Sequence, residues 1–354
     1  MAMEPLPTAI QAEHLTDVLR RSGALGDGRV REVVVENARD TIVSHIKRLR
    51  LSYDGAASGP ASLILKTGHP GRAGDGDQNA GRQEVAFYNQ VAPAMRLGLV
   101  PRCFDAQWDE GTRAWHILLE DLSDTHFIAT IWPLPPTDAQ CGTIVDAWAR
   151  FHAAWWDDPR FGVSIGVWPD TNSMERFLRD LTGRYTRFAD LLGDRLTPER
   201  RDLLERLFDA APRLLGRNRT RRHVTIAHRD AHVWNCFLPR DGSDDVRIFD
   251  WENWRIGLGP NDLAYMMATH WYPERRRRLE RPLLDRYHAG LLANGVCGYD
   301  RRSLDDDYRW SVLWQITTPI WQATMDLPPM IWWSNLERTM LAVDDLDCRG
   351  LLSG

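Results

Sequence analysis

Cysteine is scarce in this chain of 354 residues, and its five copies follow neither a disulfide pattern nor a metal-binding pattern. They are widely spaced, odd in number and without a C-x-x-C pair: Cys103, Cys141, Cys236, Cys297 and Cys348. Disulfide-rich secreted domains carry an even set of cysteines, and structural zinc sites use closely spaced pairs. We therefore expect reduced thiols in a cytoplasmic protein, with no zinc site.

Long apolar runs and an excess of positive charge are also missing. No run of eighteen apolar residues occurs, and the opening MAMEPLPTAI lacks the basic region and apolar core of a secretory leader. The net charge of −5 and the pI near 6.1 give no electrostatic case for nucleic acid or an anionic membrane as a partner. We interpret the basic run ERRRRLER at residues 274–281 as a solvated helix face.

The most informative segment that is present is HRDAHVWN, at residues 228–235. It contains Asp230 and Asn235, and Asp250 follows fifteen residues after Asn235. Phosphoryl transfer needs a carboxylate that takes the proton of the attacking hydroxyl, and oxygen ligands that hold magnesium on the phosphates of a nucleotide. Asp230 suits the first task, and Asn235 with Asp250 suits the second. The pattern therefore predicts a phosphoryl-transfer site.

The residues around this segment predict how it is held. TIA at residues 225–227 and VRIF at residues 246–249 are typical of short buried strands, and PRDGSDD at residues 239–245 is typical of a turn. Asn235 and Asp250 would then flank a hairpin-like unit. We expect His228 to brace the loop by hydrogen bonding. His232 could contact the γ-phosphate or the acceptor, or it could brace the loop as well.

A nucleotide site of this kind also needs a cation on the phosphates and a carboxylate that orients this cation. PASLILKT at residues 60–67 is a strand pattern that ends near Lys66. GRQEVAFYNQV at residues 81–91 has helical apolar spacing, which leaves Glu84 on the border of the buried face. A strand lysine followed by a helix glutamate predicts the ion pair that enzymes of the kinase type use.

The segment WHILLEDL, at residues 115–122, is an apolar strand pattern that runs into Glu120, Asp121 and Leu122. In a two-lobed kinase the connector lies at this point, and its backbone can pair with the edge of a purine. A buried strand that ends in an exposed turn is the alternative interpretation.

The ordered set Lys66, Glu84, LLEDL, HRDAHVWN and FDWENWRIGLGPNDLAYM resembles the aminoglycoside phosphotransferase and choline kinase superfamily, and within it the ecdysteroid-kinase-like branch. ARFHAAWWD at residues 149–157 is similar to a helix that this branch carries before its catalytic loop. The resemblance extends from about residue 10 to 270, and it is weakest in the last eighty residues.

The resemblance implies an α+β, bilobal, protein-kinase-like fold. A small N-terminal lobe with an antiparallel sheet, one key helix and the connector would span residues 1–122, and a mainly helical lobe would span residues 123–354. It further implies ATP or GTP as donor, Mg²⁺ as cofactor, and a small-molecule hydroxyl as acceptor. We expect a monomer or a homodimer.

Two features depart from the family pattern. The turn between the first two expected strands, at residues 30–36 and 41–53, would run from Asn37 to Asp40, and it contains no glycine. Backbone N–H groups in such a turn approach phosphates less closely than those of a glycine-rich loop. The resemblance nevertheless makes Asn37 and Asp40 candidates for phosphate contacts. Secondly, Trp251 follows Asp250, and we expect it to be a packing anchor.

Two other classes of protein are open. The triplet HRD is also found in protein kinases, but these enzymes have a glycine-rich loop and a long activation segment after the metal-binding aspartate. This chain runs from Asp250 into a helical pattern that Asp262 opens within a dozen residues. A nucleotide-binding pseudoenzyme is the other class. The side chains that such a protein would be expected to have lost are all present, namely Lys66, Glu84, Asp230, Asn235 and Asp250.

Several tryptophans cluster late in the chain, and Trp310 and Trp314 share a helical face. Core packing is one interpretation. The other is that they wall the acceptor pocket, which would suit a sugar, a nucleoside or another partly apolar alcohol. Carboxylates such as Asp305 and Asp326 would suit a cationic aminoglycoside. We also include Glu252, next to the metal site, among the candidate acceptor contacts. The sequence does not separate antibiotic inactivation from a metabolic role.

Overall fold

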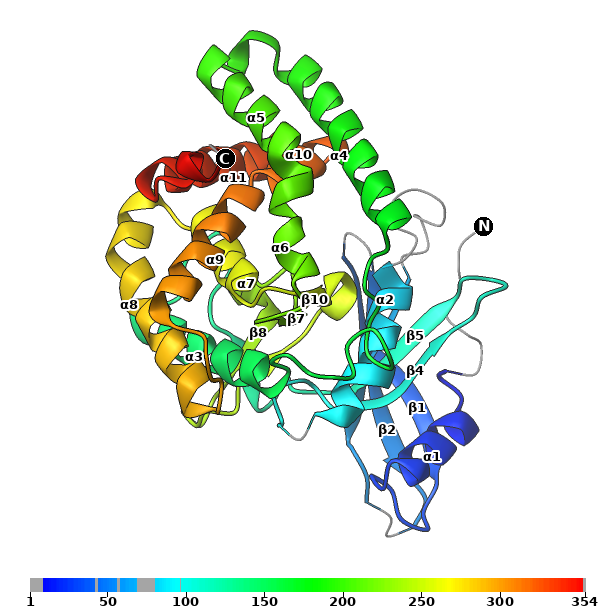
Figure 1. Cartoon of the computed structure of the whole chain (residues 1–354). Helices are drawn as coiled ribbons and strands as arrows, with labels where there is room; N and C mark the ends of the chain where they lie inside the picture. Colours follow the sequence, from blue (N-terminus) through cyan, green and yellow to red (C-terminus); the bar gives the residue numbers. More distant parts are fainter. Residues whose placement is uncertain (1–8, 42–43, 56–57, 69–79, 96, 353–354) are drawn as a thin grey trace. The chain divides into compact units, whose positions relative to one another are not determined.

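The computed structural model describes residues 9–41, 44–55, 58–68, 80–95 and 97–352 (Figure 1). It contains two compact units, of which the first comprises Met1–Ile128 and Cys236–Trp254, and the second comprises Ala129–Asn235 and Arg255–Gly354. The division expected from the sequence did not include the return of Cys236–Trp254 to the first unit. Among the described residues, no helix has both the length and the apolar character needed to cross a bilayer.

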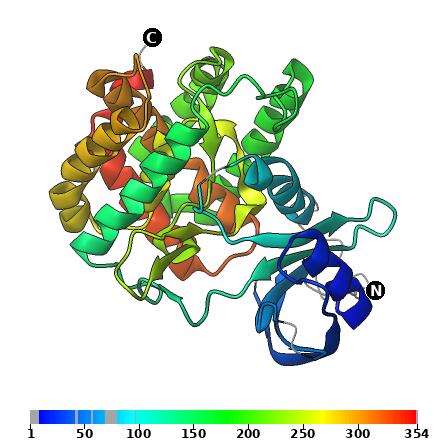
Figure 2. The ribbon, with the colours of Figure 1, turned by 90° about the horizontal axis from the view of Figure 1, so that it is seen from below.

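A five-stranded antiparallel sheet forms the centre of the first unit, in the order β1-β2-β3-β5-β4. The strands are β1 (Val30–Asp40), β2 (Ser44–Tyr53), β3 (Ser62–Gly68), β4 (Cys103–Trp108) and β5 (Trp115–Glu120). Helix α1 (Ala12–Arg21) lies against the sheet, where it contacts β1 and β4 (Figure 2). Its apolar stripe shares one core with the leucines of the sheet. Gly23, at φ 69°, follows the helix at its end.

The first hairpin is longer than expected. Residues 37–40, which we predicted to form the turn, continue β1 and pair with His45–Arg48 of β2 in antiparallel register. An irregularity between Val35 and Asn37 shifts the alternation of side chains, which explains why the apolar pattern alone ended the strand too early. The prediction of a turn from Asn37 to Asp40 was therefore wrong.

The first unit also contains a helix, which contacts β4 and β5, and a second, small sheet. Helix α2 (Ala80–Ala86) continues as a π-helical turn over Phe87–Val91. The strands β6 (His126–Ile128), β8 (Cys236–Pro239) and β9 (Arg247–Ile248) form a small sheet in the order β6-β8-β9. The pairing of β8 with β9 confirms the expected hairpin-like unit.

The second unit is mainly helical. Helix α3 (Asp138–Ala154) packs against α8 (Pro273–Ala293), and the two lie side by side in Figures 1 and 2. The other helices are α4 (Thr171–Leu192), α5 (Pro198–Leu214), α6 (Gly216–Arg219), α7 (Pro260–Ala264), α9 (Arg301–Trp314), α10 (Thr317–Thr324) and α11 (Pro329–Asp345). Strands β7 (Thr225–Ala227) and β10 (Arg255–Gly257) form a two-stranded ribbon.

Short polar side chains define where the long helices of this unit begin. Thr137 accepts a hydrogen bond from the backbone of Gln140, and the side chain of Gln140 accepts one from the backbone of Thr137, which completes a capping box before α3. The side chains of Asp170, Thr197 and Asp300 each accept one backbone N–H at the start of α4, α5 and α9. Asp305–Asp307 thus lie about one turn inside α9, which begins at Arg301.

Candidate active site

Lys66 of β3 is buried between carboxylates of the first unit. Its Nζ lies 2.7 Å from Oε2 of Glu84 on α2 and also contacts Oδ1 of Asp250. Burial opposes the charge of Lys66, but Asp250, Glu84 and Glu252 outweigh burial and raise the pKa of the lysine. The expected ion pair of Lys66 with Glu84 is therefore present. Glu84 is fully buried and not at the border of the helix, and this burial raises its pKa against the attraction of Lys66.

Carboxylates outnumber the ammonium group in this cluster. Oxygen atoms of Glu84, Asp250 and Glu252 lie within 4.8 Å of one another. Carboxylate oxygens gathered in this way are the hard ligands that a divalent cation such as magnesium prefers, so the residues fit magnesium. Glu252, which we predicted to contact the acceptor, places its carboxylate beside those of Glu84 and Asp250.

The backbone at Asp250 is strained and is secured by aromatic packing. Asp250 has φ 69° and ψ 58°, a left-handed conformation that costs a residue other than glycine on the order of 1 kcal/mol or more. The next residue, Trp251, is fully buried and stacks on Phe87 with a centroid distance of 4.0 Å and an interplanar angle of 6°. Trp254 donates its indole N–H to the carbonyl of Gln83 on α2, at 2.7 Å. Trp251 is thus the packing anchor that we expected.

The chain after Asp250 has no room for a long activation segment. A 3-10 turn at Trp251–Asn253 and strand β10 are followed at once by α7, which begins at Pro260. The absence of this segment, expected from the sequence, is confirmed for this described stretch.

In the second unit, Asp230 lies in the loop after β7, and hydrogen bonds orient its side chain. Its Oδ1 accepts a hydrogen bond from the hydroxyl of Tyr265 at 2.7 Å. Asn235 donates from Nδ2 to the backbone carbonyl of Asp230 at 2.9 Å and to Oδ2 at 3.2 Å. These two bonds engage the amide nitrogen of Asn235 with Asp230.

Asp262, in α7, holds the backbone of this loop through hydrogen bonds, and we call this arrangement a brace. Its side chain is fully buried, and its two oxygens accept hydrogen bonds from the backbone N–H groups of His228, at 2.7 Å, and of Arg229, at 2.8 Å. Arg229 has φ 68°, so the bond also secures a left-handed residue directly before Asp230. Charge-assisted bonds of this kind are about twice as strong as neutral ones. Our sequence interpretation used Asp262 only as a helix start and missed this role.

A second layer of buried groups holds Asp262 in turn. The Nε2 of His152 on α3 lies 3.2 Å from Oδ2 of Asp262, and its Nδ1 lies 2.8 Å from the hydroxyl of Tyr287 on α8. Gly259 allows this close approach, because a Cβ there would come within 2.3 Å of the Tyr287 hydroxyl. The run GLGPNDLA carries a signal for this brace, since its glycine and aspartate meet the same histidine.

Three histidines near Asp230 have different surroundings. His228 is fully buried, and its Nδ1 accepts the backbone N–H of Asp230 at 3.2 Å, which agrees with the expected bracing role. His232 places Nε2 3.7 Å from Oδ2 of Asp230. His270 follows the π-helical turn Tyr265–Thr269, and its Nδ1 lies 2.8 Å from the carbonyl of Tyr265. Burial lowers the pKa of His270 to about 3, helped by His232 and Arg338, so this ring is neutral at physiological pH.

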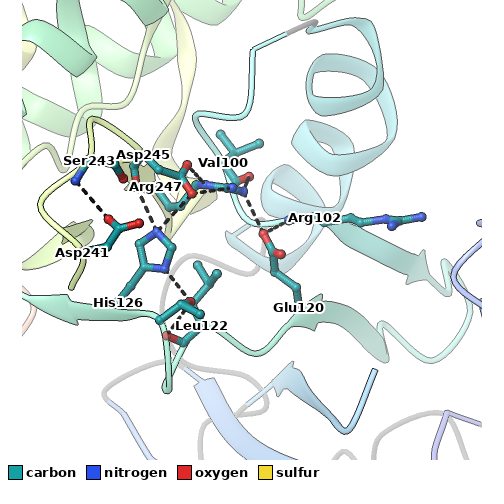
Figure 3. Close-up of polar contacts among 10 residues, drawn as sticks. Val100, Arg102, Glu120, Leu122, His126, Asp241, Ser243, Asp245 and Arg247 are labelled. Carbon is teal, nitrogen blue, oxygen red and sulfur yellow. Dashed lines mark hydrogen bonds and ion pairs between the residues drawn. The ribbon is translucent and has the colours of Figure 1, made fainter. Parts of the chain in front are cut away.

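The side chains of the expected connector are engaged in the first unit, as Figure 3 shows for Glu120. Oε1 of Glu120 accepts hydrogen bonds from the backbone N–H of Arg102, at 2.8 Å, and from Arg247, at 2.9 Å. Arg247 also pairs with Asp245, and the carbonyl of Asp245 lies 2.9 Å from Nε2 of His126. These bonds tie β5 to the β8–β9 hairpin.

The next two connector residues are also engaged. Asp121 accepts hydrogen bonds from Arg48, Ser62 and Ser123. These bonds prevail over burial and lower the pKa of Asp121 to about 2. The carbonyl of Leu122 accepts the backbone N–H groups of Thr125 and His126.

The other candidates have contacts of their own. Asn37 and Asp40 are strand residues of β1, and Asp40 contacts His45. In the second unit, Asp305 pairs with Arg301 on the exposed side of α9, and Asp326 follows α10 with φ 57°.

The two late tryptophans are engaged in packing. Trp310 donates its indole N–H to the carbonyl of Leu214 at 3.0 Å and stacks on Trp314, at a centroid distance of 5.9 Å. Trp314 itself is buried. For this pair, core packing is therefore what the contacts show.

Comparison with known proteins identifies a family for the chain. The model of a family described as "phosphotransferase enzyme family" matches residues 51–303, which is more than half of the chain. No curated protein matches the sequence.

Solved structures share the fold at low sequence identity. One from Ralstonia eutropha, assigned to the aminoglycoside phosphotransferases, has a TM-score of 0.56 and 14% identity, covering 96% of this chain and 98% of that one. A choline/ethanolamine kinase family protein from Mesorhizobium loti has a TM-score of 0.50 and 13% identity, covering 90% and 92%. The GDP complex of aminoglycoside 2'-phosphotransferase-IIIa has a TM-score of 0.51 and 12% identity, covering 96% and 99%. The expected kinase-like α+β fold is confirmed.

Proposed function

Because this chain belongs to the phosphotransferase enzyme family, we propose that it transfers the γ-phosphoryl group of ATP or GTP to a hydroxyl group of a small molecule. The observation that carries the proposal is the buried cluster of Lys66, Glu84 and Asp250. A lysine fixed between carboxylates is a preorganised cation for phosphate oxygens, and preorganised charges act without a reorganisation cost.

Asp230 is the proposed base. The acceptor oxygen forms a bond to the γ-phosphorus, the bond from this phosphorus to the β-phosphate oxygen breaks, and the electron pair leaves with the nucleoside diphosphate. The proton of the acceptor hydroxyl passes to the carboxylate of Asp230. Tyr265 and Asn235 orient this carboxylate, which keeps the reacting oxygen atoms in line.

Asp250 and Asn235 are the proposed magnesium ligands, and Glu252 is a third candidate because its carboxylate lies beside that of Asp250. When bound, the metal would neutralise charge on the phosphate oxygens. Glu84 positions Lys66, and the backbone of the segment from Glu120 to Leu122 is the proposed contact for the purine. We keep Asn37 and Asp40 as candidates for phosphate contacts at the β1–β2 hairpin.

The experiment that tests this function is a screen of the purified chain with ATP and with GTP in the presence of magnesium. The acceptor panel contains aminoglycosides, nucleoside antibiotics, macrolides, sugars, choline and sterols. Mass spectrometry detects an acceptor that has gained one phosphate, and Asp230→Asn is the control that should form no product. The proposal fails if no acceptor gains a phosphate with either nucleotide.

A further inference from the structure

Two histidines and an aspartate of the first unit converge on one point. His14 lies in the first turn of α1, Asp105 lies on β4 and His116 lies on β5. Nε2 of His14 lies 3.0 Å from Oδ2 of Asp105, and Nε2 of His116 lies 2.8 Å from the same oxygen. The proposed phosphoryl transfer uses none of these three side chains.

The pairing of the strands and the position of α1 bring the three side chains together. β4 and β5 are antiparallel, and their register pairs Asp105 with Leu118. His116 lies two residues before Leu118 on β5, so it shares a face of the sheet with Asp105. Leu118 belongs to the hydrophobic core that α1 completes. His14 therefore reaches Asp105 and His116 from the helix that covers this face.

The carboxylate of Asp105 receives more donors on one oxygen than that oxygen can serve. Besides the two histidines, Gln107 donates from Nε2 to Oδ2 at 3.0 Å. A carboxylate oxygen has about two lone-pair sites, so three donors compete for them. A metal ion held by the two ring nitrogens and Oδ2 would remove this competition. It would occupy one lone pair of the oxygen and leave the other for Gln107, which would then orient the ligand carboxylate.

The distances also suit a metal ion. Bonds of about 2.0 to 2.1 Å to a tetrahedral zinc ion place ligand atoms about 3.3 to 3.4 Å apart. The two nitrogen–oxygen distances need to lengthen by about half an ångström to reach this separation. One potential ligand atom from each residue lies within 4.8 Å of the others. The imidazole planes of His14 and His116 are 84° apart, so the two rings approach the carboxylate in different planes.

Burial leaves this cluster accessible from one side. The side chain of His116 is 1% exposed, whereas those of His14 and Asp105 are 18% and 12% exposed. This exposure gives an ion a path from solvent and leaves room for a water molecule as fourth ligand. Burial opposes the charge of Asp105, but hydrogen bonds from the neighbouring side chains outweigh burial and lower its pKa. The ligand oxygen is therefore negatively charged at neutral pH.

The second ring nitrogen of His116 limits the expected affinity. Its Nδ1 is buried and has no hydrogen-bond partner among the residues that the structure describes. Metal-bound histidines usually donate this N–H to an outer acceptor, and losing such a partner weakens metal affinity about 10- to 100-fold. We therefore expect weaker binding than at a closed site with four protein ligands.

We propose that His14, Asp105 and His116 bind one transition-metal ion, with Zn²⁺ as the expected occupant, and that this ion joins α1 to β4 and β5. Mg²⁺ prefers oxygen ligands and imidazole suits zinc, so this site differs in chemistry from the carboxylate cluster around Lys66. The expectation that the chain has no zinc site rested on cysteine alone, and this site uses no cysteine. It does not depend on the proposed function.

Titration calorimetry of the full, tag-free chain with ZnCl₂ tests the site. Excess MgCl₂ is present throughout, because Mg²⁺ competes for carboxylate sites and not for imidazole. We expect one Zn²⁺ per chain with a Kd in the micromolar range. Co²⁺ should bind at the same site, and its visible absorption spectrum reports tetrahedral coordination in the wild type without any substitution.

Variants assign the zinc to these residues. His14→Ala is the mildest change, because His14 is the most exposed of the three, and it should weaken zinc binding at least about 100-fold. Asp105→Asn should have a similar effect. His45→Ala is the matched control, because His45 also pairs with an aspartate, Asp40, but does not belong to the three-residue cluster. Zinc should raise the Tm of the wild type and of His45→Ala, and it should leave the Tm of His14→Ala unchanged.

Three results would overturn the proposal: no zinc binding by the wild type in excess magnesium, equal zinc affinity of the wild type and His14→Ala, or loss of binding in His45→Ala. Each would leave the three side chains as a hydrogen-bonded contact between α1 and the sheet. None of these results bears on phosphate transfer, which the acceptor screen tests separately.

Discussion

The two units secure their functional side chains by different means. In the first unit, charge does this work, since Lys66 is buried among Glu84, Asp250 and Glu252. In the second unit, Asp230 is oriented by hydrogen bonds from Tyr265 and Asn235, above a backbone that the buried Asp262 braces. Removing one charged partner from a buried cluster is strongly destabilising, because the other charges stay buried and unpaired. Removing one hydrogen bond from the brace leaves its other hydrogen bonds in place.

This difference has a consequence for substitutions. A change in the charge cluster should weaken both the fold of the first unit and nucleotide binding. A change in the brace should slow transfer and leave the nucleotide affinity close to that of the wild type. The following substitutions test this contrast, in decreasing order of expected effect.

Lys66→Met should have the largest effect. It removes the cation from a buried set of three carboxylates, which should lower kcat/KM by about 10²- to 10³-fold and weaken nucleotide binding. Loss of one partner of a buried ion pair should also cost about 3 kcal/mol of stability. Steady-state kinetics and urea unfolding measure the two effects. The chain has only one other lysine, Lys47 on β2, so Lys47→Met is the matched control. Equal kinetics of the two variants would refute the role of Lys66.

Asp262→Asn should come next. The substitution replaces one acceptor oxygen by a donor, which faces either a backbone N–H or His152. We expect kcat to fall about tenfold to a hundredfold and the unfolding free energy to fall by about 2 kcal/mol, while the Kd for the nucleotide stays within a factor of two to three. Asp306→Asn, at an exposed position of α9, is the control. A nucleotide Kd that rises as much as kcat falls would contradict the separation of the two mechanisms.

His270 predicts a pH dependence of stability that is specific to the second unit. Its pKa is about 3 in the folded chain and about 6.5 when unfolded. A base with a depressed folded pKa contributes stability above pH 6.5, and this contribution is lost as the pH falls toward 3. Between pH 6.5 and 4.5 the loss should be about 2 kcal/mol. His270→Gln should reduce this slope in urea unfolding experiments, with His288→Gln on α8 as control. An unchanged slope would show that His270 protonates in the folded state.

Tyr265→Phe should have the smallest effect of the series. It removes one hydrogen bond to Oδ1 of Asp230 and leaves the ring in place. One such bond is worth about 1 kcal/mol, so kcat should fall about fivefold without a change in nucleotide affinity. Tyr185→Phe on α4 is the control, and rapid-quench measurement of a single turnover isolates the chemical step. A decrease beyond a hundredfold would mean that Tyr265 contacts a reacting group directly.

The contrast between the units also explains what the sequence could reveal. Lys66 and Glu84 could be paired from residue type and order, because a strand pattern that ends near a lysine is followed along the chain by a helical pattern that carries a glutamate. Trp251 could be recognised as an anchor from its position beside Asp250. The ion pair and its aromatic anchor could therefore be predicted from local sequence patterns.

Other features depend on partners that are distant in sequence. Asp262 braces His228 and Arg229 across more than thirty positions, and His152 and Tyr287 hold it in turn. The run GLGPNDLA contains the glycine and the aspartate of this brace, but it does not identify their distant partners. The β1–β2 turn was misplaced because an irregularity at Val35 broke the alternation on which the strand end was judged. The late tryptophans fit either packing or a pocket by spacing alone, and only the bond of Trp310 to Leu214 separates these interpretations for that residue.

We propose that Asp230 accepts the proton of the acceptor hydroxyl and that the charge cluster of the first unit binds the nucleotide independently of Asp230. The most direct measurement compares wild type with Asp230→Asn, using an acceptor found in the screen, for both product formation and nucleotide Kd. Asp209→Asn, on the exposed face of α5, controls for the loss of a charge. We predict that Asp230→Asn loses at least 10³-fold in kcat and keeps the nucleotide Kd of the wild type. Turnover within tenfold of the wild type would contradict the assignment of Asp230 as the base.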